Sequence, residues 1–301
     1  MQGIMYDHIQ NLDKSRTNWR IKVRCTRFWQ TVSNDNNAVK GYNFILLDDD
    51  NSHIHAYVYP NNWSAIGKEV VEGNVYVFQN FQVRDSTGKL KPVSTKLCIR
   101  LLSSTTIEEQ SNDHLIPRYK FEFMDFGDIN EESKKVVGDE NPEYAIDIIG
   151  VIEHFDKMKK IDTRIGKREV TRFVISDGSI PHKVTLWGEL AIAVSSDYYK
   201  PEIEQPVICI LTSAKIGTFM DNVSVGTLPS TRVFFNLDIE PVVEFRNRLI
   251  EGGYRPGVGN TNVSNNYAPT LEHVSFADLI ANPETMFAKA SFMGSTVESL
   301  A

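Results

Sequence analysis

Two aromatic residues lie at the ends of strand-like runs, where a flat ring can stay open to a ligand. Trp187 closes the alternating run in VTLWGELA and stands directly before a glycine, and Tyr59 closes a similar run in HIHAYVYP. An exposed ring can stack on another flat aromatic group, whereas a half-buried strand-end tryptophan serves only the core or its rim. Basic residues on neighbouring strands favour the first interpretation, because they attract an anionic ligand.

The residue types that carry catalysis or bind metals form no recognisable pattern. The sequence contains no G-x-x-x-x-G-K-S/T loop, no H-E-x-x-H and no G-x-S-x-G, and its seven histidines are scattered. Cys25, Cys98 and Cys209 lie far apart in apolar runs, so we expect reduced core residues. The acidic group at 48–50 fits a hairpin apex better than a metal site. We therefore expect a binding protein, with no catalytic activity and no cofactor.

Charge is distributed unevenly along the chain. The 301 residues carry a formal net charge of −7, which taken alone argues against a polyanionic partner. Residues 17–104 nevertheless hold 11 Lys and Arg against 7 Asp and Glu, whereas residues 105–143 hold 4 against 11. A basic groove on a folded unit is therefore compatible with the acidic total. No apolar run is long enough for a bilayer and the start lacks signal-peptide order, so we expect an intracellular protein without a membrane partner.

The elements that must position these side chains are mostly strands, because the dominant apolar period is two. Two equivalent sets of five strand-like runs follow each other, and in each set a helix-compatible stretch separates the third run from the fourth. The predicted strands cover 19–30, 42–48, 53–59, 74–83 and 94–102, then 144–155, 168–177, 180–187, 206–216 and 221–227, with helices at 63–73 and 188–199. This repeat predicts an all-β fold with short helices, built as two tandem five-stranded barrels. Two β-sandwiches would need about seven strands each.

The repeat also sets the expected domain boundaries and gives Trp187 and Tyr59 the same position, at the end of the third strand. In an oligonucleotide-binding (OB) fold the face of strands two and three binds the ligand, and an aromatic residue there can stack on a base. We expect a lead-in over 1–16, a first OB fold over 17–104, an acidic linker over 105–143, a second OB fold over 144–250 and a flexible tail over 251–301.

Several segments carry a family resemblance. LIPRYKFEFMDFGDI, YAIDIIGVIEHF, KREVTRFVISD, VTLWGELA and ILTSAKIGTF resemble the second central DNA-binding domain of the replication protein A large subunit. WRIKVRCTRFW, IHAYVYP and EGNVYVFQNF resemble the first such domain, in the divergent form common among plant proteins. The likeness covers residues 17–250 and is stronger in the second half. It implies a nuclear protein that binds single-stranded DNA in DNA replication, repair or recombination.

The resemblance also implies roles for particular residues. In the second OB fold it implies that Trp187 and Phe219 stack on bases, and that Arg172 and Lys215 meet phosphate oxygens.

In the first OB fold the resemblance places base stacking on Tyr59 and a base-edge or phosphate donor at His55. Leu90 stands where the family has a second aromatic residue, and a histidine that is mostly neutral at pH 7 replaces the usual arginine at 55. The cations that keep this unit net basic are Arg24, Arg27, Arg84, Lys89 and Lys91, and we expect Arg84, Lys89 and Lys91 to contact the nucleic acid. We expect Trp19, Trp29 and Trp63 in the core or at barrel ends, and Lys157, Lys159 and Lys160 in a solvated turn.

Related binders share this chemistry. A telomere-end binder or a single-stranded RNA binder would use the same stacking, which is indifferent to the sugar unless the 2′-hydroxyl is read. A protein-interaction adaptor without nucleic acid would not need the aromatics and cations of the second unit. Residues 273–301 resemble the start of the family's third barrel, so we expect either a fragment or a member reduced to two central modules. The zinc ribbon and trimerisation helix of that barrel are not in this sequence, which leaves association with other replication protein A subunits open.

Overall fold

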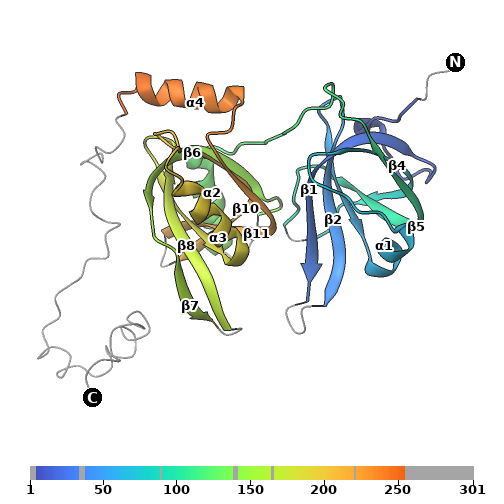
Figure 1. The fold of residues 1–301 in the computed structure, drawn as a ribbon, viewed down its shortest axis with the longest axis horizontal. Helices are drawn as coiled ribbons and strands as arrows, with labels where there is room; N and C mark the ends of the chain where they lie inside the picture. The colour runs from blue at the N-terminus through green and yellow to red at the C-terminus, as the bar shows by residue number, and fades with distance from the viewer. Residues whose placement is uncertain are drawn as a thin grey trace, which may run out of the picture. The chain divides into compact units, whose positions relative to one another are not determined.

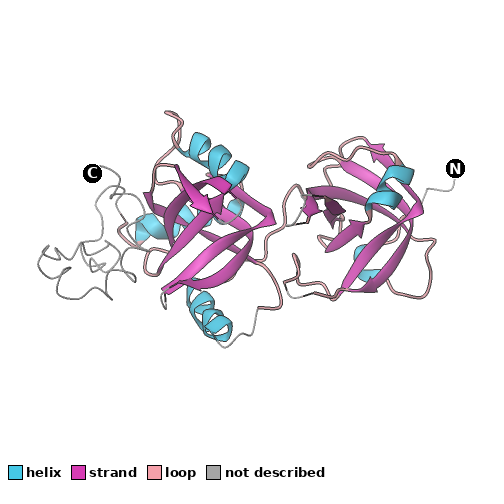
Figure 2. Ribbon diagram, turned by 90° about the horizontal axis from the view of Figure 1, so that it is seen from below, coloured by secondary structure: helices cyan, strands magenta, loops and turns pink. Residues whose placement is uncertain are grey.

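The computed structural model describes residues 5–33, 38–88, 90–137, 142–163, 166–219 and 222–254. Strands dominate these residues and curl into two barrels, with short helices outside them (Figures 1 and 2). The expected all-β fold with two tandem five-stranded OB-fold barrels is therefore confirmed. The expected start of a third barrel, at 273–301, lies outside the described residues. None of the described helices combines the length and the apolar character that a membrane crossing requires.

The first barrel closes in the strand order β1-β2-β3-β5-β4, in which β3 and β5 pair in parallel. Its elements are η1 (Ile9–Asn11), β1 (Arg20–Val32), β2 (Val39–Leu47), β3 (His53–Val58), α1 (Pro60–Ile66), β4 (Val75–Asp85) and β5 (Leu97–Gln110). Alternate residues fill the core; on β3 these are Ile54, Ala56 and Val58. The helix starts earlier than expected, with Pro60 in its first turn, and ends at Gly67, whose φ of 61° few other residues tolerate.

The second barrel follows the same plan with one added strand. Its elements are β6 (Ile146–Phe155), β7 (Lys159–Thr163), β8 (Gly166–Ser176), β9 (Pro181–Trp187), α3 (Gly188–Tyr198), β10 (Ile208–Phe219) and β11 (Asn222–Phe235), flanked by α2 (Phe126–Val137) and α4 (Glu240–Glu251). Because β6 pairs with both β10 and β8, five strands close into a ring in the order β6-β10-β11-β9-β8, and β7 extends β8 as a hairpin.

The stretch expected as an acidic linker contains regular structure. Strand β5 continues beyond residue 104 to Gln110, and α2 buries Phe126 and Ile129 in the core of the second barrel. The helix comes so close to the sheet that a side chain at Gly150 would lie 2.9 Å from the Phe126 ring. Charged residues are numerous in this stretch, but its apolar residues Phe126 and Ile129 pack it against the second barrel.

Helix α4 covers the outer side of β6 and β10. Val242, Phe245 and Leu249 recur at helical spacing and pack against Ile208 and Ile210. On β10 these two isoleucines alternate with Cys209 and Leu211, which face the barrel core. Both faces of β10 are therefore buried, and the strand is apolar throughout that stretch.

The cysteines are buried as expected, and the acidic group lies at the expected hairpin turn. All three cysteines are buried and free of disulfides. The acidic group forms the turn between β2 and β3, where the buried Asp48 carboxylate accepts hydrogen bonds from the backbone N–H groups of Ser52 and Ile9, each at 2.8 Å.

Candidate functional site

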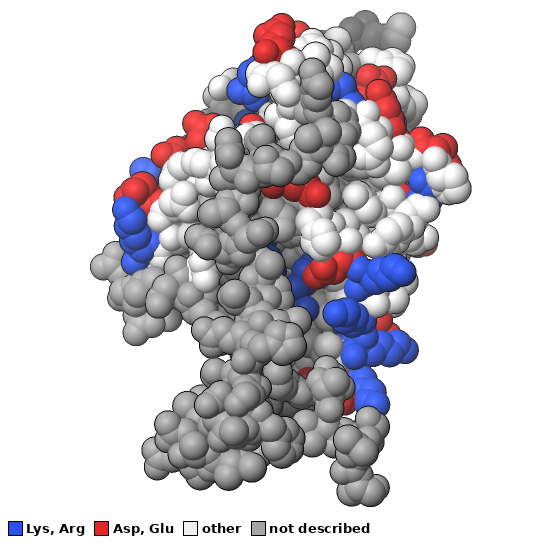
Figure 3. Space-filling view, turned by 90° about the vertical axis from the view of Figure 1, so that its left-hand side faces the viewer, with Lys and Arg blue, Asp and Glu red and all other residues white. Residues whose placement is uncertain are grey.

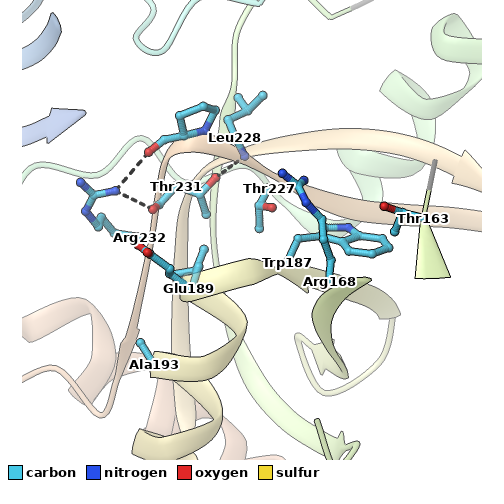
Figure 4. Close-up of a pocket in the computed structure, with 11 residues that line it drawn as sticks. Thr163, Arg168, Trp187, Glu189, Ala193, Thr227, Leu228, Thr231 and Arg232 are labelled. Atoms are coloured by element: carbon cyan, nitrogen blue, oxygen red, sulfur yellow. Dashed lines mark hydrogen bonds between the residues drawn. The ribbon is translucent and has the colours of Figure 1, made fainter. Parts of the chain in front are cut away.

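Trp187 lies in a groove of the second barrel. The groove has a volume of about 920 Å³, within the range of about 300–1,000 Å³ that is usual for ligand sites. It is lined by Thr163, Arg168, Trp187, Glu189, Leu190, Ala193, Thr227, Leu228, Pro229, Thr231 and Arg232 (Figure 4). The indole is half-buried and does not belong to the core, so part of the ring faces the groove.

The backbone explains why a tryptophan precedes a glycine here. Val184 and Leu186 point into the barrel core, so strand alternation turns Trp187 to the outer face. Trp187 keeps an extended backbone as the cap of α3, and Gly188 follows with a φ of 60°, a conformation that suits glycine. The chain thus passes from strand to helix within one residue, which fixes the indole at the mouth of the groove.

Cationic side chains lie on the same outer face. Val170 on β8 pairs with Trp187 across the sheet, and Arg172 pairs with Thr185. Because Arg168 and Arg172 are each two residues from Val170, they share its face. Arg168 is exposed and lines the groove, and its side chain makes no hydrogen bond or ion pair with another residue in the described ranges. The sequence interpretation assigned Arg172 but missed Arg168, which the same alternation could have identified.

The other two predicted residues of this barrel lie on β10. Lys215 is exposed between Ala214 and Ile216, which are both in the core, so its ammonium group points outward. The backbone of Phe219 ends the strand opposite Asn222, and its side chain lies outside what the structure describes. Lys215 is not among the described residues that line the Trp187 groove.

The hairpin of β7 and β8 adds further cations. Lys157, Lys159 and Lys160 are exposed where the hairpin begins, and Lys160 pairs with Glu169 at 3.3 Å. The predicted solvated turn is therefore partly a strand, β7. On the face that Figure 3 presents, Lys and Arg side chains form a large group at the lower right and smaller groups elsewhere.

The first barrel also has a groove, here called the first groove, which brings together three predicted residues, His55, Tyr59 and Arg84. Its volume is about 520 Å³, and Tyr57 and Cys98 also line it. Tyr59 is 50% exposed and Arg84 is exposed, so both can reach a ligand.

His55 differs from these two in charge. Its Nε2 lies 3.1 Å from Oδ1 of Asn43, and burial lowers the pKa of the imidazole from 6.5 to about 4. His55 is therefore neutral at pH 7. It can form a hydrogen bond or stack, but it cannot neutralise a phosphate.

Three cations that contribute to the positive charge of the first unit already bind other groups of the protein. Arg24 is buried and donates hydrogen bonds to four backbone carbonyl oxygens, those of Gly73, Asp113, Ile116 and Pro117. Arg27 is buried and donates to the hydroxyl groups of Thr212 and Ser213. Lys91 pairs with Glu143 at 2.6 Å. The predicted Lys89 lies outside the described residues.

Arg232 is a groove residue that the sequence interpretation did not single out. Its guanidinium donates to the backbone carbonyl oxygens of Thr231, at 2.9 Å, and Pro229, at 3.3 Å (Figure 4). It also forms an ion pair with the carboxylate of Glu72 and donates to the carbonyl oxygen of Phe28. In Figure 4 it lies at the opposite end of the drawn group from Trp187 and Arg168.

The remaining tryptophans divide into two kinds. Trp19 is buried in the core and Trp63 packs against it, as expected. Trp29 does not join the core. It contacts the ring of His55, with the ring centroids 5.7 Å apart.

Two family models match the chain in succession, and the boundary between them falls within α2. The model described as "Domain of unknown function DUF223" matches residues 10–132, and the model described as "Replication protein A OB domain" matches residues 135–236.

Curated relatives match across most of the chain. A 70 kDa DNA-binding subunit of replication protein A from Arabidopsis thaliana is 26% identical over 79% of this chain, and the corresponding protein of Xenopus laevis is 24% identical over 84%. The chain spans only 27% and 42% of the lengths of these two relatives. A solved replication protein A heterotrimer bound to single-stranded DNA superposes with a TM-score of 0.55 and 20% identity, over 82% of this chain and 55% of the matched chain, which shows a shared fold.

Proposed function

This chain belongs to the family of the replication protein A large subunit, and from that premise we propose that it binds single-stranded DNA with its two OB folds. The proposed setting is DNA replication, repair or recombination in the nucleus. The proposal gives the chain no catalytic role, and other subunits of replication protein A are candidate partners.

Binding combines two kinds of contact. Unpaired bases stack on Trp187, Phe219 and Tyr59, and each stacked base contributes about 1–3 kcal/mol. Four cations of the second barrel neutralise phosphates along the strand. Arg168 and Arg232 line the Trp187 groove, and Arg172 and Lys215 lie outside it on the same barrel. A duplex cannot offer its bases to these rings, because they are paired and stacked inside the helix.

One observation carries the proposal. Trp187 is held at the end of β9 in a groove that it shares with the cation of Arg168, whose side chain has no partner among the described residues. A ring beside a guanidinium suits a ligand with flat faces and regular negative charges, which describes a single strand. Tyr59 has the equivalent position in the first barrel, where it follows β3 and lines a groove together with Arg84. The strand can occupy both grooves, and occupancy of one raises its effective concentration at the other.

The test is fluorescence anisotropy with single-stranded DNA, RNA of the same sequence and duplex DNA. We expect Trp187→Ala combined with Phe219→Ala to weaken binding of single-stranded DNA at least about tenfold. We also expect affinity to fall with salt, with a log–log slope of about −0.7 for each neutralised phosphate.

Tyr199→Ala is the matched control. Tyr199 is an aromatic residue of the same barrel that is 52% exposed and does not line the groove. Unchanged binding by a folded double mutant would refute the proposal. Equal affinity for RNA would favour the RNA-binding alternative, and no binding to any of the three probes would favour the adaptor.

A further inference from the structure

The first barrel carries a row of four rings on the outer face of β1 and β3. Trp29 and His55 have ring centroids 5.7 Å apart and planes within 14° of each other. His55 and Tyr57 follow at 6.2 Å and 30°, and Tyr57 meets Tyr59 edge to face at 5.8 Å. We call Trp29, His55, Tyr57 and Tyr59 the aromatic row.

Strand alternation and register place the row outside the barrel. On β3 the core residues Ile54, Ala56 and Val58 alternate with the three rings, which therefore point outward. Trp29 reaches the same face from β1, because Asn43 of β2 pairs with both Trp29 and Tyr57. Three neighbouring strands thus put one side chain each at this level of the sheet.

Hydrogen bonds hold the middle of the row in place. The side chain of Asn43 donates to the hydroxyl of Thr31 at 2.9 Å, and its oxygen lies 3.1 Å from the ring nitrogen of His55. The imidazole is neutral at pH 7, so it adds an uncharged flat ring between Trp29 and Tyr57. The row therefore consists of uncharged aromatic surface from one end to the other.

Cations border the row at the Tyr59 end. The guanidinium of Arg100 lies 5.4 Å from the centroid of the Tyr59 ring, and Arg100 pairs with Tyr57 across the sheet. Its Nε is buried and has no hydrogen-bond partner among the described residues. Arg84 lines the same cavity as His55, Tyr57 and Tyr59. Positive charge beside stacked rings is the combination that suits an unpaired strand.

We infer that Trp29 and Tyr57 are further base-stacking positions, which extend the platform of Tyr59 along the outer face of β1 and β3. The ligand class is an unpaired nucleobase of single-stranded DNA, and the inference rests on the proposed function. The row supplies aromatic surface to a barrel that has Leu90 where its family has a second stacking aromatic residue. The first groove then binds mainly by stacking, with Arg84 and Arg100 as its cations.

Paired substitutions at the same positions test the inference. Tyr57→Ser and Trp29→Leu remove a ring, whereas Tyr57→Phe and Trp29→Phe keep one. In anisotropy titrations with single-stranded DNA we expect each ring-removing variant to lose at least about fivefold in affinity, and each ring-keeping variant to stay within about twofold of the unsubstituted protein. Thermal unfolding of each variant shows whether the barrel is intact.

Photo-crosslinking gives a second readout that does not require substitution. An oligonucleotide with 5-iododeoxyuridine at successive positions, irradiated on the unsubstituted protein, should form crosslinks to Trp29 and Tyr57 that peptide mapping detects. If Trp29→Leu does not fold, this measurement still shows whether Trp29 contacts a base.

The outcomes separate the inference from the proposed function. If the Trp187 and Phe219 double mutant binds weakly while folded ring-removing variants of the row bind normally and no crosslink maps to the row, only the inference is overturned. If the double mutant binds as well as the unsubstituted protein, the proposed function itself fails.

Discussion

Replacing Glu72 with Gln should strengthen binding of single-stranded DNA and steepen its salt dependence. The Glu72 carboxylate forms an ion pair with Arg232, which lines the Trp187 groove. A strand phosphate that takes over this guanidinium must therefore displace a carboxylate. Glutamine removes the charge but keeps an oxygen that can accept the backbone N–H of Phe28, now bonded to Glu72 at 2.7 Å. The substitution thus frees Arg232 while it preserves the local hydrogen bond.

The magnitude follows from the exposure of the pair. The two side chains are 28% and 36% exposed, and an ion pair of this kind contributes about 1 kcal/mol at most. Removing the competition should therefore raise affinity by up to about fivefold. One more neutralised phosphate should steepen the log–log salt slope by about 0.7.

Anisotropy titrations over a series of salt concentrations measure both quantities. Glu108→Gln is the control, because Glu108 is an exposed carboxylate on β5 that lines neither groove and gives the same change in net charge. An unchanged slope in the Glu72 variant, or an equal gain in the Glu108 variant, would refute a phosphate contact at Arg232.

Two further predictions concern buried groups of the first barrel. Arg24→Met leaves four carbonyl oxygens without their donor, so the free energy of unfolding of this barrel, measured in urea, should fall by about 3 kcal/mol or more. The salt slope of DNA binding should not change. A shallower slope with intact stability would instead identify a phosphate contact. Burial lowers the pKa of His55 to about 4, so the folded state favours the neutral ring. The free energy of unfolding that depends on the neutral imidazole is fully present above about pH 6.5 and is lost as pH falls toward 4. In urea titrations across that range, His55→Gln should lose less stability than the unsubstituted protein. The same decrease in both proteins would contradict this prediction.

The sequence predicted most of the fold because strand alternation is a local signal. Both sets of five strands lie where period-two runs occur, and α3 occupies the expected stretch after Trp187. Strand β7 was missed because KKIDT is short and largely exposed, so that only its pairing with β8 reveals it. Helix α2 was missed because its charged residues outnumber the apolar anchors Phe126 and Ile129. Helix α4 was detectable from the spacing of Val242, Phe245 and Leu249.

The site was predictable only where position in a strand decides the role. The positions of Trp187 and Tyr59 at the ends of equivalent strands follow from the repeat. The repeat does not show which cations are free to contact a phosphate. A count of basic residues cannot distinguish Arg84, which is exposed, from Arg24, which is buried among carbonyl oxygens of residues distant in the sequence. The contact between Trp29 and His55 likewise depends on the pairing of β1, β2 and β3.

The two grooves differ in their proportions of aromatic rings and cations. In the second barrel a single half-buried indole lies among several cations, of which Arg168 is unpaired within the described ranges. In the first barrel a row of uncharged rings has two bordering arginines, Arg84 and Arg100. Because salt weakens phosphate contacts by counterion release and acts little on stacking, the second groove should account for most of the salt dependence. The first groove then retains the strand when salt rises, and tethering to a retained strand keeps the second groove close enough to rebind.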